Sequence, residues 1–316
     1  MQFTTQIPIP KSNHPIDYNS RIVSLGSCFA ENIGEKFNYY KFQNTVNPFG
    51  IIFNPISIEN IISRAVNQNY FTEKDVFFHN ELWHCYEVHS ELSNPNKEIF
   101  ITSLNKNLDD FCFQIIKASH CIITYGTSWV YKLKASNVIV ANCHKVPQKA
   151  FEKEILATTT IEKAVENTVA LFKKFNPNCS IIFTVSPVRH IKDGFVENQR
   201  SKAHLQSAIH EIVSGQLSNI NYFPSYEIMM DELRDYRFYA EDMLHPSTIA
   251  VNYIWERFCQ TQISETAISV MEEVVTVQKG LAHRPFNSNT DNHRKFLDTL
   301  SQKIIKLQEQ FLHIEF

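Results

Sequence analysis

The chain has 316 residues, of which 43% are hydrophobic and 24 are phenylalanine, so it is long enough to bury a large core. Its formal net charge is −3 and its pI is about 6.5. This balance excludes the basic surface of a nucleic-acid-binding protein and a general attraction to anionic membranes. No stretch approaches the ~18 consecutive apolar residues of a membrane span.

The N-terminal residues and the cysteines indicate in which cellular compartment the protein is expected. Residues 1–8 lack the charged region followed by an apolar run that marks a signal peptide. The seven cysteines are an odd number scattered through apolar runs, which is typical of reduced core thiols. We therefore expect a cytoplasmic protein. The sequence also lacks a nucleotide-binding glycine fingerprint.

The first folded elements centre on Gly26-Ser27. An apolar run over 21–25 predicts a buried strand, and Phe29, Ile33 and Phe37 recur every four residues, which predicts a helix. Gly26 permits the backbone angles of a tight strand-to-helix turn. Ser27 then either caps the helix or presents its hydroxyl at the carboxyl edge of a sheet, beside the positive end of the helix dipole.

Strand and helix patterns alternate along the chain as far as residue 260. Further strands are predicted over 42–47, 121–125, 180–185 and 220–223, and helices over 57–68 (capped by Ser57), 95–119, 159–175, 198–213 and from 247 onward. Residues 75–90 are interpreted as a β-hairpin or loop insertion, 129–133 and 138–141 as a pair of β segments, and 236–246 as a loop.

From Ser264 onward the pattern is helical only. Two apolar stripes predict two helices that pack on the domain, on a partner or on another copy of the chain. The stripes are Ile268, Met271 and Val275, and then Phe296, Leu300, Ile304, Leu307 and Phe311. We therefore predict a domain over 1–262 and a helical extension over 263–316, with a homo-oligomer formed through these helices as one outcome.

The alternation predicts an α/β fold, a doubly wound and mostly parallel sheet with helices on both faces. Ligand sites in such sheets lie outside the carboxyl ends of the strands. Ser27, Gly50, Gly126 and Ser186 all follow predicted strands. We expect them to meet at one edge.

A second candidate motif lies in the predicted loop near the end of this region. In Asp242-x-x-His245 the short spacing lets the carboxylate reach the near nitrogen of the imidazole, and the far nitrogen then faces a nucleophile. Pro246 restrains the loop. The alternative is a solvated loop that happens to hold an Asp and a His.

Residues 26–30, Gly-Ser-Cys-Phe-Ala, spell the motif of the GSCFA family, which resembles the SGNH, or GDSL-like, hydrolases. The wider resemblance covers roughly residues 20–260. It implies a flavodoxin-like fold, Ser27 as nucleophile, and Asp242 and His245 as the other members of a catalytic triad.

The resemblance also implies an oxyanion hole. The amides of Ser27 and Gly50 are similar in position to two of its donors. In SGNH enzymes the third donor is an Asn in a Gly-x-Asn turn, whereas this sequence has Ser128 there. Asn142 is an alternative donor from a nearby loop. The chain also lacks the Asp of a Gly-Asp-Ser motif, so it departs from the pattern at the oxyanion hole more than at the triad.

Other polar and aromatic residues are candidates for substrate binding. His79, His84 and His89 are spaced by five residues, which places neighbours on opposite faces of a strand and disfavours a metal site. Adjacent Cys143 and His144 rarely face each other, which disfavours a cysteine nucleophile. The candidates are His84, Trp129, His144, Arg189 and His190, of which Arg189 and His190 suit an anionic or polyhydroxylated substrate but also fit a salt-linked surface loop.

Two hypotheses follow. The first is an esterase that cleaves a small-molecule or carbohydrate ester, such as an acyl or acetyl group, or an acyltransferase if a sugar hydroxyl replaces water. Such an enzyme needs no metal or organic cofactor. The second is a binding or scaffold module that keeps the fold with a weakened site.

Overall fold

The computed structural model describes residues 5–214, 219–287 and 289–316. Its centre is a sheet of five parallel strands in the order β10-β9-β5-β1-β2. The strands are β1 (Arg21–Gly26), β2 (Gln43–Val46), β5 (His120–Tyr125), β9 (Ser180–Val185) and β10 (Ile220–Tyr222). When only these five strands are numbered in chain order, their order across the sheet is that of flavodoxin-like folds.

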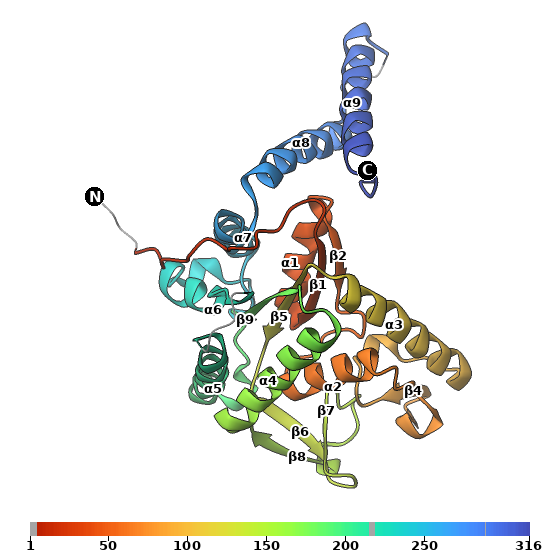
Figure 1. The fold of residues 1–316 in the computed structure, drawn as a ribbon, viewed down its shortest axis with the longest axis vertical. Coiled ribbons are helices and arrows are strands. Elements are labelled where there is room, and N and C mark those ends of the chain that lie inside the picture. Colours follow the sequence, from red (N-terminus) through yellow and green to blue (C-terminus); the bar gives the residue numbers. More distant parts are fainter. Residues whose placement is uncertain (1–4, 215–218, 288) are drawn as a thin grey trace.

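Helices cover both faces of the sheet (Figure 1). One face packs on α2 (Pro55–Val66), α3 (Lys97–Lys117), α4 (Thr158–Phe175) and α5 (Phe195–Ser214), and the other on α1 (Cys28–Tyr39) and α7 (Thr248–Gln262). Successive residues of a strand point to opposite faces of the sheet: Val23 packs in the core beneath α2, α3, α4 and α5, and Ile22 packs in the core beneath α1 and α7. The prediction of a doubly wound α/β fold is confirmed.

Two small antiparallel sheets are inserted into this plan. The hairpin of β3 (Val76–His79) and β4 (Leu82–Cys85) occupies the insertion predicted over 75–90. The second sheet contains β6 (Trp129–Leu133), β7 (Val138–Val140) and β8 (Phe151–Ile155). The sequence patterns predict β6 and β7 but miss β8, whose residues Phe-Glu-Lys-Glu-Ile carry three charges.

The predicted start of α2 is wrong. Asn54, not Ser57, caps the helix, and its side-chain oxygen accepts the Ser57 amide at 2.9 Å. Pro55 is the first helical residue, because its fixed φ suits that position and its missing N–H has no partner to lose.

The C-terminal helices form an arm that projects from one end of the molecule (Figure 1). These helices are α8 (Glu265–Ala282) and α9 (Asp291–Gln310). Outside the arm, a short helix α6 (Ser225–Glu227) precedes α7. The arm contacts the amino-terminal side of the sheet, where the Phe311 ring lies 5.0 Å from Tyr18 and Gln278 donates to the carbonyl of Tyr39. The carboxyl edge of the strands therefore stays clear of these contacts. None of the helices in the described parts of the chain has the length and apolar character needed to cross a bilayer.

Candidate active site

Ser27 lies at the corner between β1 and α1. Gly26 has a φ of +132°, a region that glycine tolerates best. Ser27 is the N-cap of α1, and its Oγ accepts the amide of Phe29 at 3.3 Å. The Ser27 amide donates to the carbonyl of Thr124 on β5 at 3.1 Å. The side chain is 0% exposed, so a substrate reaches it only if neighbouring groups move.

Asp242 and His245 form a hydrogen-bonded pair on a surface loop. Asp242 Oδ2 lies 2.6 Å from His245 Nδ1, and Oδ1 accepts the amides of Leu244 and His245. The His245 amide, then the Leu244 amide and the imidazole, lower the pKa of Asp242 to about 2, so the carboxylate is ionised at neutral pH. About half of each side chain is exposed.

The loop of this pair lies against the carboxyl end of β9. The Arg189 amide, just beyond that strand, donates to the carbonyl of Leu244 at 3.1 Å. Ser27 and the Asp-His pair thus occupy the same edge of the sheet, with β5 between β1 and β9. Within residues 5–214, 219–287 and 289–316, no hydrogen bond joins Ser27 to His245.

Two of the substrate-binding candidates, Arg189 and His190, lie beside this edge. The Arg189 guanidinium stacks 3.9 Å from the ring centroid of Tyr239 and lines a cavity of about 270 Å³. His190 is largely buried, edge-on to Phe53, and its Nε2 has no partner among the described residues. Burial, followed by the charges of Lys202 and His245, lowers the pKa of His190 to about 3.

The candidate oxyanion donors Gly50 and Ser128 are engaged elsewhere. The Gly50 amide donates to the carbonyl of Asn47 at 2.7 Å. Ser128 is 0% exposed, and both its amide and its hydroxyl bond to Ser201 on α5. The neighbouring Trp129 also turns toward α5, where its indole N–H donates to the carbonyl of Glu197 at 3.4 Å.

Asn142, His84 and His144 gather in a separate cluster beside the β3–β4 hairpin. Asn142 Oδ1 accepts from Ser90 Oγ and from the His144 amide. His144 Nε2 lies 2.7 Å from the carbonyl oxygen of Cys85, and its ring centroid is 4.7 Å from that of His84. None of these contacts involves Ser27, and the two histidines are buried with partners for both ring nitrogens, as is usual for buried polar groups.

We expect acid to destabilise the fold through His144. Burial lowers its pKa to about 4. The unfolded value is about 6.5, so between these pH values the unfolded chain binds more protons and stability falls as pH falls. The loss between pH 7 and pH 4 is about 2–3 kcal/mol. Urea unfolding at both pH values tests this: His144→Gln should lose that much less than wild type, whereas His283→Gln, at an exposed site, should match wild type.

Lys202 on α5 belongs to the same edge and is not singled out by the sequence patterns. Its side chain is 1% exposed, and its Nζ donates to the carbonyls of Gly126 and Ser186, each at 2.7 Å. Those residues follow β5 and β9, so Lys202 joins the ends of the two strands. The one sequence signal is its position on the otherwise amphipathic helix α5, where its neighbours on the buried face are Asn198, Leu205 and Ile209.

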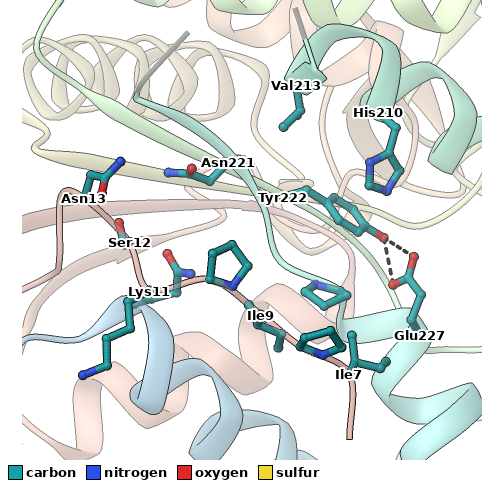
Figure 2. Close-up of a pocket in the computed structure, with 14 residues that line it drawn as sticks. Ile7, Ile9, Lys11, Ser12, Asn13, His210, Val213, Asn221, Tyr222 and Glu227 are labelled. Atoms are coloured by element: carbon teal, nitrogen blue, oxygen red, sulfur yellow. Dashed lines mark hydrogen bonds between the residues drawn. The ribbon is translucent and has the colours of Figure 1, made fainter. Parts of the chain in front are cut away.

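A larger cavity of about 460 Å³ lies elsewhere, between the N-terminal segment and the free edge of β10 (Figure 2). Figure 2 shows Tyr222 bonded to Glu227 on one side and Asn221 directed toward Asn13 on the other. None of the candidate catalytic residues lines this cavity, so it is separate from the Ser27 edge.

The strand order and the strand-turn-helix corner define a doubly wound α/β protein of the flavodoxin-like class. Residues 21–258 match the model of the GSCFA family, and residues 274–316 match a second one, described as GSCFA domain protein, C-terminal domain. Since the first match spans well over half of the chain, the protein belongs to the GSCFA family. A search of curated proteins found no match.

Proposed function

We propose that the protein is a serine-dependent ester hydrolase with Ser27 as nucleophile, His245 as general base and Asp242 as the residue that orients His245. The observation that carries the proposal is the 2.6 Å contact between Asp242 and His245 at the same sheet edge as Ser27. With Nδ1 occupied by a carboxylate, Nε2 is free to take a proton from a serine hydroxyl.

In the proposed reaction, Ser27 Oγ attacks the ester carbonyl carbon and its proton passes to His245 Nε2. The carbonyl π pair moves to oxygen and forms an oxyanion. When the intermediate collapses, the C–O bond to the alcohol breaks and His245 protonates the leaving oxygen. Water then attacks the acyl-enzyme in the same manner and releases the acid. A sugar hydroxyl in place of water makes the enzyme an acyltransferase.

The oxyanion site requires a rearrangement on this proposal. The amides of Ser27 and Gly50 exchange their present acceptors, Thr124 and Asn47, for the substrate oxygen. Ser128 and Asn142 contribute only if they leave Ser201 and Ser90.

The substrate on this proposal is an acyl or acetyl ester, with a carbohydrate as one source of the alcohol. Arg189 and His190 border the edge and suit polar or anionic groups of such a substrate. We also propose that residues 1–262 form the catalytic unit and that residues 263–316 form an extension through which copies of the chain can associate.

A panel of acetyl and longer acyl esters tests the function. Wild type should hydrolyse at least one of them, and His245→Ala should lower kcat/KM by about 10³-fold or more, because the general base is lost. His283→Ala, an exposed histidine in the arm, should match wild type. Equal activity in wild type and His245→Ala would contradict the proposal.

A second candidate function is that of a non-catalytic binding module. The full burial of Ser27 and its bond to the Phe29 amide favour this alternative, because a helix cap is a complete role for a serine. The cavity beside β10 then provides space for a ligand. Under this alternative, His245→Ala and Ser27→Ala leave any trace esterase activity unchanged.

A further inference from the structure

Lys202 is a buried amine without a carboxylate partner among the described residues. Its Nζ has two protein acceptors among the described residues, the carbonyls of Gly126 and Ser186. An ammonium has three N–H donors, so one is left over. No carboxylate lies within salt-bridge distance of Lys202 in the described parts of the chain, although charged groups are seldom buried without a partner.

The groups that face Lys202 come from three parts of the chain. Cys28, the residue after Ser27, interacts electrostatically with it, and so does His190 from the segment after β9. The ring of Tyr226 lies 5.6 Å away. Burial lowers the pKa of Lys202 to about 7, and Cys28 opposes this shift. The Lys202 amine thus lies at the end of β5, the strand that pairs with β1 at the Ser27 corner, and it is charged below about pH 7.

We propose that Lys202 is a functional member of the candidate active site, whose ammonium stabilises the negative charge that develops when Ser27 attacks a substrate. This inference rests on the proposed function. On this proposal Lys202 supplies a charged group to the oxyanion site and compensates for the missing Asn donor, whose position in the turn is taken by Ser128. A fixed charge in a site shielded from water stabilises an oxyanion more strongly than the same charge in solution.

The backbone carbonyls of Gly126 and Ser186 orient the ammonium. Both bonds are 2.7 Å long, and their acceptors follow the adjacent strands β5 and β9, so the lysine cannot turn out to solvent without breaking them. A neutral donor would satisfy these carbonyls without the cost of burying a charge. The presence of a lysine therefore points to a use for the charge itself, beyond the link between β5 and β9.

Labelling by a fluorophosphonate tests the proposal, because its attack by serine also creates negative charge on oxygen. We compare the rate at Ser27 in wild type, Lys202→Met and Lys202→Gln between pH 5 and pH 10. Wild type should lose rate at alkaline pH as Lys202 deprotonates. Lys202→Met should label about 10²-fold more slowly at pH 6.5 and should lack this alkaline decline.

Lys202→Gln separates charge from hydrogen bonding, because glutamine keeps N–H donors but is neutral. It should label as slowly as Lys202→Met. Labelling of Lys202→Gln at the wild-type rate, or a wild-type rate that rises as Lys202 deprotonates, would overturn the proposal in favour of a purely structural tie or a basic amine. Near-ultraviolet circular dichroism identifies a variant that fails to fold.

The alkylation rate of Cys28 by iodoacetamide gives a readout independent of hydrolysis. A nearby cation favours the thiolate, so Lys202→Met should slow alkylation by about 3- to 10-fold at pH 6.5, where Lys202 carries its charge. Cys143, also partly exposed, is the control in the same sample and should not change. An unchanged Cys28 rate overturns the proposed charge even if Ser27 labels. A slowed Cys28 rate in a protein whose Ser27 never labels supports the charge and rejects the hydrolase.

Discussion

Replacing Ser27 by alanine is expected to reduce ester hydrolysis by at least about 10³-fold, because the acyl-enzyme of the proposed reaction forms on the Ser27 hydroxyl. The substitution also removes the cap of α1, which costs about 1 kcal/mol of stability. Initial rates on the best ester, measured well below the melting temperature, separate these two effects.

Ser264→Ala provides a matched control. Ser264 caps α8 in the same way, since its Oγ accepts the Ala267 amide at 3.2 Å, but it lies in the C-terminal arm. We expect a similar loss of stability and unchanged turnover. If Ser27→Ala and Ser264→Ala retain the same activity, Ser27 is a helix cap and nothing more.

Gly26→Ala is expected to destabilise the fold more than Gly194→Ala does. A Cβ at this position would lie 2.0 Å from the carbonyl oxygen of Thr124, a backbone atom that cannot move aside, and the φ of +132° disfavours any side chain. We expect a loss of at least about 4 kcal/mol, or failure to fold.

Gly194→Ala separates backbone strain from collision. Gly194 also has a positive φ, +99°, but nothing lies within 4 Å of an added Cβ. Its loss should be about 1–2 kcal/mol. Urea unfolding of both variants measures the difference. Equal losses would contradict the close approach of β5 to the Ser27 corner.

The architecture could be predicted because each core element carries its own periodic signal. The apolar runs of β5 and β9 are buried along their whole length, as the continuous hydrophobic pattern indicates. The sequence does not predict β8, because three of its five residues are charged and its place in the small sheet depends on pairing with β6. A pattern within one segment does not report a partner elsewhere in the chain.

The residues of the candidate site also differ in whether their contacts can be predicted from the sequence. The pair of Asp242 and His245 is local, so its spacing alone predicts the contact that the structure has. The positions of Ser128 and Asn142 depend on tertiary partners, Ser201 and Ser90, which no spacing reveals.

Lys202 is the clearest case of information that only the fold supplies. Along the sequence it is one lysine on a helix, with no motif around it. Its burial follows from the approach of α5 to the ends of β5 and β9, and its acceptors come from Gly126 and Ser186, which are distant in the chain.

Covalent labelling with a fluorophosphonate, followed by peptide mass spectrometry, tests the central claim most directly, because the probe reports an activated serine without knowledge of the substrate. We expect the label on the peptide that contains Ser27, and its loss in His245→Ala. Absence of label at Ser27 in folded wild-type protein, or undiminished labelling in His245→Ala, would contradict the proposed triad.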